Sequence, residues 1–359
     1  MPSPLELQAE EFRKAGIPIK KGIRKLSDND KNETPWVVAE SVWLQRWAKH
    51  ACQNYPIVSR SLGVRYLADS CRGIPVFVVG IGPSLDDNIQ DLKLAQNRAI
   101  IIATDASLRP LLAKGIKPHI TINFDCQKDQ KTMWEDTPTE GLLLIASSCT
   151  HPDTIDAWKG PILFYNQWHD KDVFIHKLLP YIYPHIGQIP SSGTVGNMGI
   201  ILARIMGCSP IYTVGMDLCY QKNENGWIYR CKDYKHVLDE IGVRNWTVTK
   251  NNVLYDNDIR VKRSFEEEIG GQTYRTDPEL KLYREGLLGI FDAMQLKIQD
   301  CSINGVLKHY FNNTTVNEAI MESCREDLQG GRTILFHVEH CIPNGKLIWK
   351  EDSKNGSNY

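Results

Sequence analysis

The sequence predicts an α/β fold in which an open, doubly wound and mostly parallel sheet carries helices on both faces. Two observations favour this class. Short continuous apolar runs, of the length of buried strands, recur between Pro75 and Tyr220 and alternate with stretches of helical periodicity. Each run ends in glycine or a polar residue. Strands spaced by helices pair in parallel, and coverage on both faces explains why the runs are continuously apolar.

Residues 1–70 precede this pattern and predict a helical N-terminal arm or cap. They are rich in charged residues and helix formers, with Trp36, Trp43 and Trp47 at helical spacing. Tryptophans at that spacing more often form a packed face than a platform for a ligand. We therefore expect this part to pack on the core or to contact a partner.

The core, residues 71–220, contains six apolar runs that we predict as strands. They are residues 76–79, 99–103, 118–125, 141–147, 161–166 and 210–220. In such sheets ligands bind beyond the carboxyl ends of the strands. That rule selects the following candidates for a binding site: Gly80, Ile81, Gly82, Pro83, Ser84, Thr104, Asp105, Asp125, Asn166 and Asp217.

The first turn, residues 80–84, reads as the passage from a strand into a helix. Its two glycines permit close approach of a ligand to the backbone, Pro83 fixes the turn, and Ser84 is suited to cap the helix. The N–H groups of such a helix start attract phosphate, although Asp86 and Asp87 already neutralise part of the helix dipole. No Gly-Lys-Ser/Thr follows, so the turn is not a Walker loop, and a βα turn without a ligand stays open as an alternative.

A second candidate anion site precedes the last predicted strand of the core. Ser191, Ser192 and Thr194 surround Gly193 immediately before a helix with a face of small residues. Small side chains let that helix press closely against the sheet. An ordinary Ser/Thr cap is the alternative, and it accounts for one hydroxyl but not for three.

Composition excludes several function classes. The 42 basic and 43 acidic residues give no basic field for nucleic acid. No apolar run is long enough for a membrane span, and the polar start of the chain is not a secretory signal, so we expect a cytoplasmic protein. Ten scattered cysteines without a CxxC pair predict reduced thiols and no zinc site.

The region after the core, residues 221–330, predicts a lid and C-terminal helices that complete it. The stretch after Tyr220 lacks a clear period and reads as a long loop over the strand ends. Residues 245–263 predict a hairpin, and Asp277 with Pro278 predicts the start of a helix. Residues 331–359 predict a hairpin and a disordered tail.

Three segments in this order carry a resemblance to a known family. They are VVGIGPSL (78–85), SSGTVG (191–196) and VGMDL (214–218). Together they resemble the 6-hydroxymethylpterin diphosphokinase MptE-like domain family, which includes the bacterial motility accessory factors. They are more distantly similar to bacterial sialyltransferases that use a CMP-activated donor. The resemblance covers roughly residues 72–322 and implies a Rossmann-like core in a nucleotide-using transferase.

The resemblance implies roles for individual residues. Both glycine turns would hold the nucleotide and its phosphate, while Thr104, Asp105, Asp125 and Asp217 would line the site. His236 is the candidate base for an acceptor hydroxyl, because the pKa of histidine lies near neutrality, and a solvated loop histidine is the alternative. Asp217 is the second candidate catalytic residue, and capping a loop or binding a ribose are its alternatives.

Three functions stay open at this point. The favoured one is sialyltransferase-like transfer of a sugar from a CMP-type nucleotide donor to a small-molecule, glycan or protein acceptor. Resemblance to the pterin enzymes implies a second reaction, ATP-dependent diphosphate transfer, in which Mg²⁺ would need carboxylates such as Asp125 and Asp217. A nucleotide-binding module without catalysis is the third.

Overall fold

The computed structural model of the chain describes residues 35–168, 174–191, 193–234, 253–256, 259–302 and 304–324. Within these residues a central sheet contains nine strands, all parallel to their neighbours. In chain order they are β1 (Val76–Val79), β2 (Ile100–Thr104), β3 (Ile120–Asn123), β4 (Leu143–Ser147), β5 (Ile162–Trp168), β6 (Gln188–Pro190), β7 (Ile211–Val214), β12 (Ile298–Asp300) and β13 (Asn312–Asn313). The α/β class and the doubly wound parallel sheet are thereby confirmed.

The strand order creates a switch point beside β1. The order is β13-β12-β7-β1-β2-β3-β4-β5-β6, so the chain runs outward from β1 to β6 and then returns to place β7 on the other side of β1. Val76 of β1 is in register with Ile100 of β2 and with Ile211 of β7. In open α/β sheets the crevice for a ligand lies at the carboxyl ends of the two strands that flank such a point.

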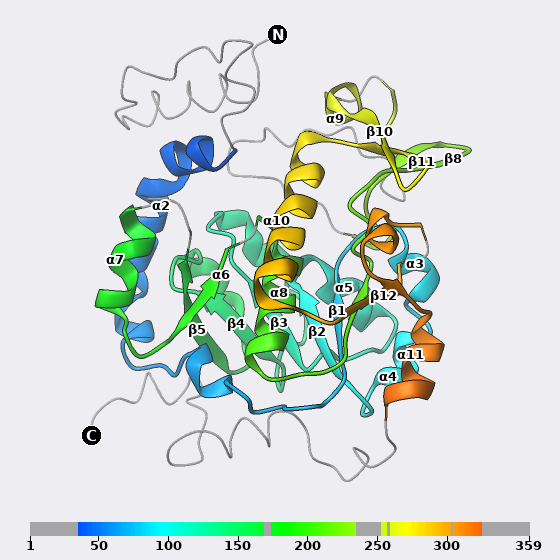
Figure 1. Cartoon of the computed structure of the whole chain (residues 1–359). Coiled ribbons are helices and arrows are strands. Elements are labelled where there is room, and N and C mark those ends of the chain that lie inside the picture. The colour runs from blue at the N-terminus through cyan, green and yellow to red at the C-terminus, as the bar shows by residue number, and fades with distance from the viewer. Residues whose placement is uncertain are drawn as a thin grey trace.

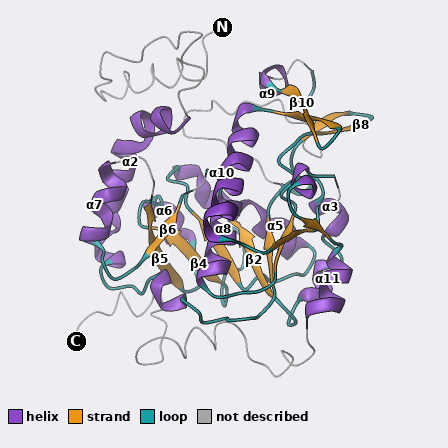
Figure 2. Cartoon of the chain, viewed as in Figure 1, coloured by secondary structure: helices purple, strands orange, loops and turns teal. Residues whose placement is uncertain are grey.

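Alternating side chains of the strands divide the core into two layers, and helices cover both (Figure 1; Figure 2). Phe77 and Val79 face a layer packed by residues of seven helices: α2 (Pro35–Val58), α3 (Leu85–Asn88), α4 (Leu92–Ala95), α5 (Asp105–Ala113), α6 (Pro152–Ala157), α7 (Phe174–Ile182) and α11 (Val316–Ser323). Val76 and Val78 face the layer of α8 (Val195–Ile205) and α10 (Pro278–Met294). Because each strand is covered twice, all four residues of β1 are fully buried.

Helix α8 lies against the middle of the sheet, as its small residues predict. A Cβ atom on Gly199 would lie 2.9 Å from Cγ1 of Val78, closer than such contacts normally come. The predicted close packing of this helix is therefore confirmed. Helix α10 also begins as predicted, because Asp277 accepts a hydrogen bond from the N–H of Leu280 at 2.8 Å and Pro278 stands in the first turn.

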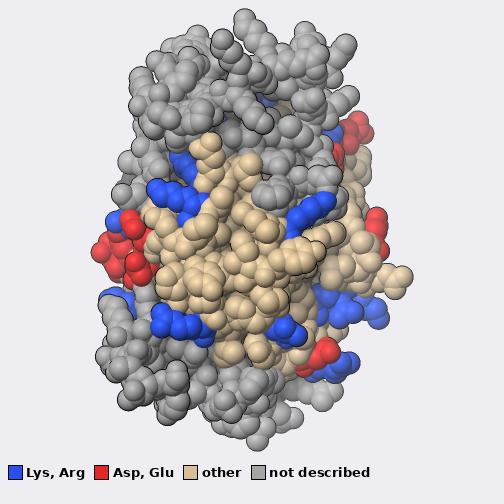
Figure 3. All heavy atoms as spheres, turned by 90° about the vertical axis from the view of Figure 1, so that its left-hand side faces the viewer, with Lys and Arg blue, Asp and Glu red and all other residues tan. Residues whose placement is uncertain are grey.

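The tryptophan-bearing segment forms α2, which packs along α7. Trp47 is 7% exposed and its ring centroid lies 4.6 Å from that of His176, so a packed face is confirmed at this position. On the outer side of this pair Tyr55, Leu178 and Tyr181 stay exposed. Figure 3 views this side of the molecule, where charged side chains lie around an extended area that has none.

Several elements differ from the sequence-based predictions. The predicted loop after Tyr220 is an antiparallel hairpin of β8 (Gln221–Asn223) and β9 (Gly226–Ile228), since the Asn223 side chain accepts the N–H of Asn225 and so makes the turn. Part of the hairpin predicted for residues 245–263 is helix α9 (Ile259–Arg263). A second hairpin follows, formed by β10 (Phe265–Ile269) and β11 (Gln272–Thr276). Both hairpins and α9 lie beyond the sheet in Figure 1.

The last predicted core strand is shorter than expected. It ends at Val214 because Gly215 adopts a φ of +64° and Leu218 a φ of +52°, and neither value continues a strand. Short 3₁₀ helices η2 (Val64–Leu67), η3 (Lys128–Met133) and η5 (Val306–His309) complete the described elements. None of the described helices has the length and hydropathy needed to cross a bilayer. The predictions for residues 331–359 lie outside the described part of the chain.

Candidate functional site

The turn after β1 lies directly against the segment that follows β7. The N–H of Gly80 donates to the carbonyl of Val214 at 2.8 Å. The N–H of Gly82 donates to the carbonyl of Gly215 at 2.6 Å. A Cβ atom on Gly80 would lie 2.5 Å from the Gly215 oxygen, and one on Gly82 would overlap the carboxylate of Asp217. The glycines of this turn are therefore required by the approach of the chain to itself.

Asp217 lies at the start of helix α3, between the ends of β1 and β7. Its side chain is 1% exposed. The hydroxyl of Ser84 donates to Oδ2 at 2.9 Å, and the Ser84 N–H lies 3.3 Å from both carboxylate oxygens. Nε2 of Gln221 donates to Oδ1 at 3.0 Å. A carboxylate of the chain itself thus occupies the backbone donor at the helix start, and the prediction that the Ser84 side chain caps α3 is wrong, because its hydroxyl bonds to Asp217 instead.

Two buried acids at this switch point have a raised pKa. Burial raises the pKa of Asp217 from 3.8 to about 7, against the lowering effect of its hydrogen bond from Ser84. Asp300, at the end of β12, has its pKa raised by burial to about 6, and its negative charge contributes to the shift of Asp217. Oδ1 of Asp300 accepts from Oγ1 of Thr213 at 2.8 Å. Asp217 therefore exchanges its proton near neutral pH, which suits a general acid or base.

Sequence reasoning does not select Asp300. It ends a short strand in the segment IQD, as Asp217 follows the end of β7. A three-residue strand is too short to stand out as an apolar run. Its place next to β7 in the sheet depends on long-range pairing, which no local pattern reveals.

On the other side of β1, the ends of β2 and β3 form a connected polar cluster. Asp105 is 7% exposed, and Oδ2 accepts from Nδ2 of Asn123 at 2.8 Å. Burial raises the pKa of Asp105 to about 6. Thr104 donates to the hydroxyl of Ser107 at 3.0 Å. Asp125 is half-buried and accepts from the N–H of Gln127 at 3.0 Å and from a nearby glutamine side chain, so it is already engaged in its own loop.

The turn before α8 is tied to the end of β5. The N–H of Ser191 donates to the carbonyl of Trp168 at 2.7 Å, and Gly193 has a φ of +95°, which favours glycine. Thr194 is the N-cap residue of α8 by its backbone, yet its side chain makes no capping hydrogen bond. An ordinary hydroxyl cap therefore does not account for Thr194. Ser192 lies outside the described residues.

Met216 shows that the two glycine turns share one edge of the sheet. A Cβ atom on Gly80 would lie 2.9 Å from Cγ of Met216, and one on Gly196 would lie 2.9 Å from its Cε. The start of α8 and the end of β1 therefore lie on either side of a single side chain. By contrast, Asn166 is buried beneath the edge, where it bonds to Ser148 and to the carbonyl of Tyr183.

The segment after β9 runs over the first turn. The N–H of Cys231 donates to the carbonyl of Ile81 at 2.9 Å, and the N–H of Lys232 lies 3.1 Å from both carboxylate oxygens of Asp86. The N–H of Asp86 donates in turn to the carbonyl of Pro83 at 3.1 Å. Residues 229–234, which we name the covering segment, are thus fixed above the carboxyl end of β1. His236 lies beyond them, outside the described residues.

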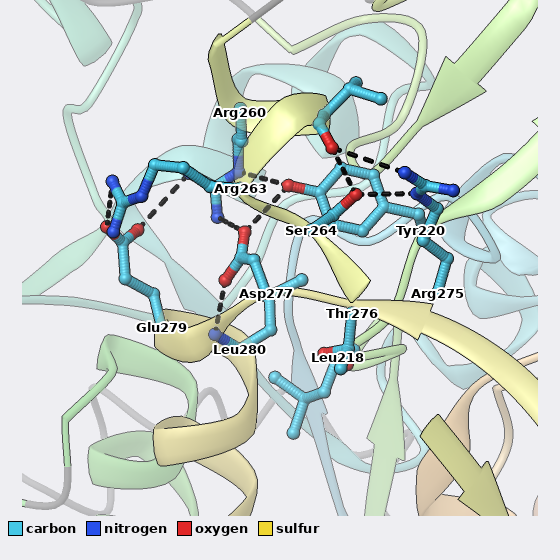
Figure 4. A network of polar contacts seen from close by, with 11 residues as sticks. Leu218, Tyr220, Arg260, Arg263, Ser264, Arg275, Thr276, Asp277, Glu279 and Leu280 are labelled. Carbon is cyan, nitrogen blue, oxygen red and sulfur yellow. Dashed lines mark hydrogen bonds and ion pairs between the residues drawn. The ribbon is translucent and has the colours of Figure 1, made fainter. Parts of the chain in front are cut away.

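A network of polar contacts joins the hairpins to the exit of β7 (Figure 4). Nη2 of Arg260 lies 2.7 Å from Oδ2 of Asp277, and the hydroxyl of Tyr220 donates to the same oxygen at 2.7 Å. Nε of Arg260 donates to the Tyr220 hydroxyl at 2.7 Å. Arg260 also lies 3.4 Å from a carboxylate oxygen of Glu279. The network fixes Tyr220, and therefore the neighbouring Gln221 that bonds to Asp217.

Part of the chain is similar to a known protein family. Residues 49–223 match the family model described as 6-hydroxymethylpterin diphosphokinase MptE-like. Among solved structures it is similar to the MAf glycosyltransferase from Magnetospirillum magneticum AMB-1, with a TM-score of 0.54 and 21% identity. That match covers 77% of this chain but only 40% of the MAf protein, so the chain spans about two fifths of the length of this relative.

A second solved structure matches with a lower score. It is the sialyltransferase CstII from Campylobacter jejuni in complex with the substrate analogue CMP-3FNeuAc, with a TM-score of 0.34 and 12% identity. The match covers 68% of this chain and 88% of that one. No curated protein sequence matches significantly. The family match and the MAf structure agree with the α/β fold described above.

Proposed function

We propose that this chain, whose residues 49–223 match the MptE-like family model, is a nucleotide-dependent transferase that moves a sugar from a CMP-type donor to a hydroxyl acceptor. The observation that carries the proposal is Asp217, a buried acid whose pKa is raised to about 7 at the switch point between β1 and β7. Acids with a pKa near neutrality at such a point are typical of catalytic sites. The similarity of the fold to that of a glycosyltransferase supports a sugar as the transferred group.

In this reaction the bond between the sugar and the donor phosphate breaks, and the acceptor oxygen forms the new bond to the sugar. The acceptor hydroxyl loses its proton to a base, and the nucleotide leaves with the bonding electrons. Asp217 in its ionised form is suited to receive that proton, with Ser84 and Gln221 holding the carboxylate in place. His236 is the other candidate for this base. Like Asp217, it follows β7 in the sequence.

The donor would lie along the edge that both glycine turns share. Residues 80–84 and 191–194 would contact the nucleotide, and Thr104, Asp105 and Asp125 would line its other side. Ile81 and Pro83 offer backbone atoms only, and Ile81 already accepts from the covering segment. Thr194 has a hydroxyl that is not used as a cap, so it is suited to donate to a phosphate oxygen.

A second candidate follows from the family name. The matched model is named after a 6-hydroxymethylpterin diphosphokinase. The reaction that the resemblance implies is transfer of diphosphate from ATP to a pterin alcohol. In that reaction Asp125 and Asp217 would be the carboxylates for Mg²⁺, and both would first have to leave their present hydrogen-bond partners. A nucleotide-binding module without catalysis is the third possibility, and turnover separates it from the other two.

Thermal unfolding in the presence of ligands tests the choice. Stabilisation by CMP or by a CMP-sugar, but not by ATP with Mg²⁺, supports the glycosyltransferase, and the reverse pattern supports the diphosphokinase. Release of CMP from a CMP-sugar then measures turnover, and binding without release supports the module. Asp217→Asn should bind the donor normally but release CMP at least ~100-fold more slowly, as expected when a general base is removed. Full activity of that variant would remove Asp217 as the base.

A further inference from the structure

Arg230 is an arginine of the covering segment that lies over the strand ends. In the sequence it lies between Tyr229 and Cys231. The N–H of Cys231 donates to the carbonyl of Ile81 in the turn after β1. The charge of Arg230 acts on Asp105 after β2 and on Tyr283 of α10. Arg230 therefore belongs to the part of the chain that crosses the turn after β1, at the switch point of the sheet.

Two aromatic rings hold the guanidinium group. Its central carbon lies 4.5 Å from the ring centroid of Tyr234 and 4.9 Å from that of Tyr229. Arginine has five N–H donors in a planar fork, and contact with the face of a ring leaves these donors at the edge of the fork. Among the described residues the buried Nε of Arg230 has no hydrogen-bond partner.

Arg260 provides a comparison within the same structure. It also stacks on Tyr229, with its central carbon 4.3 Å from the ring centroid. Its charge is balanced by Asp277 at 2.7 Å and by Glu279 at 3.4 Å. Within the described part of the chain no carboxylate lies at ion-pair distance from Arg230. Removing a cation from water without such a partner is unfavourable, and an anionic ligand would supply the missing charge.

The helix start below Arg230 is already occupied. The backbone N–H of Ser84 and its hydroxyl both point to Asp217, so this turn offers those donors to the chain itself. A phosphate at the switch point would therefore meet the side chain above it and not the Ser84 donors. Arginine is well suited to this task, because its fork binds phosphate oxygens in pairs.

We propose that Arg230, held between Tyr229 and Tyr234, binds the phosphate of the nucleotide substrate. The identity of the ligand as a nucleotide rests on the proposed function. The anion site itself rests on the position of the guanidinium group against the two rings. The ligand class is a phosphate ester or diphosphate, recognised through its charge and oxygen atoms and not through its base.

Calorimetric titration of the full-length chain with CMP, cytidine and pyrophosphate tests the proposal. Arg230→Gln should weaken binding of CMP and of pyrophosphate by about 10- to 100-fold, the equivalent of losing a hydrogen bond to a charged group. Binding of cytidine, which has no phosphate, should not change. Arg230→Lys keeps the charge but loses the fork, and we expect an intermediate loss. Lys222→Gln removes a positive charge from the neighbouring hairpin, where it is exposed, and should leave all affinities as they are.

The outcomes separate this inference from the proposed function. If pyrophosphate binds and Arg230→Gln weakens it while CMP does not bind at all, the anion site stands and the CMP-type donor is wrong. If CMP binds the wild type and Arg230→Gln equally, or if the wild type binds no anion, the role of Arg230 is refuted. Because no carboxylate in the described part of the chain pairs with the cation, Arg230→Gln should melt no lower than the wild type. Equal affinity combined with a lower melting temperature would assign Arg230 to the fold instead.

Discussion

Replacing Asp217 with asparagine should stabilise the protein at alkaline pH. The variant keeps the size of the side chain and oxygen and nitrogen atoms beside Ser84 and Gln221, but it cannot ionise. In the wild type, burial raises the pKa of Asp217 from 3.8 to about 7. Between these two values the folded state binds more protons than the unfolded chain, so the contribution of Asp217 to stability falls as the pH rises. This penalty is complete above pH 7 and is absent from the variant.

The size of the effect follows from the shift. At ~1.36 kcal/mol for each pH unit, a pKa moved from 3.8 to about 7 corresponds to roughly 4 kcal/mol of free energy of unfolding. About 2–3 kcal/mol of it should develop between pH 5 and pH 8, because the remainder accumulates at lower pH. Loss of one hydrogen bond from Ser84 or Gln221 would subtract about 1 kcal/mol at every pH. The pH-dependent part is therefore the diagnostic quantity.

Urea unfolding at pH 5, 6, 7 and 8 measures the difference in free energy of unfolding between variant and wild type. We expect the difference to move in favour of the variant at each step up to pH 8. Asp87→Asn is the control, because Asp87 lies in the same short helix but is exposed, so this variant removes a carboxylate from the turn without touching the buried one. A difference for Asp217→Asn that stays constant within about 0.5 kcal/mol over this range would refute the reasoning, since Asp217 would then titrate as in the unfolded chain.

Three further substitutions and two matched controls test the packing that builds the site, each measured by urea unfolding at pH 7. Gly82→Ala should destabilise the fold by about 1–3 kcal/mol or more, because the new methyl group would overlap a buried carboxylate. Gly199→Ala should also cost about 1–3 kcal/mol by pushing α8 away from the sheet, whereas Gly289→Ala, whose site is open, should stabilise by about 0.5–1 kcal/mol. A loss at Gly289 as large as at Gly82 would contradict the steric argument. Arg260→Met should lower the free energy of unfolding by about 3–5 kcal/mol, because its buried carboxylate partner loses its ion pair. Arg263→Met, at the exposed end of the same network, should lower it by less than about 1 kcal/mol. Equal losses would show that burial does not determine the strength of these ion pairs.

The sheet was predictable because its signal is local. A strand covered on both faces must be apolar at every position, so β1 and β4 stand out as continuous runs in the sequence. The start of α10 was equally local, since the cap and the proline are adjacent in the chain. The hairpin β10–β11 was missed for the opposite reason. Its first strand reads FEEEI and is mostly exposed, so it has no apolar run to reveal it.

The geometry of the site could not be predicted, because it depends on pairs that are distant in sequence. Ser84 and Asp217 are 133 residues apart, and nothing in either segment indicates that one supplies the hydrogen-bond partner of the other. The sequence correctly identified both as residues at strand ends. It could not show that the carboxylate would use the donors of the helix start, nor that Asp300 would lie beside it.

The hydrogen bonds between Ser84 and Asp217 at the start of α3 affect which groups can bind an anion. In a glycine turn with free N–H groups the backbone itself binds phosphate, and the glycines are selected for the ligand. Here Gly80 and Gly82 accommodate Gly215 and Asp217, so the backbone of this turn serves the packing of β1 against β7. In our proposal Arg230 supplies a positive group from above the sheet instead. Its segment, residues 229–234, depends for its position on the Arg260 network, so weakening that network should alter ligand affinity before it alters the sheet.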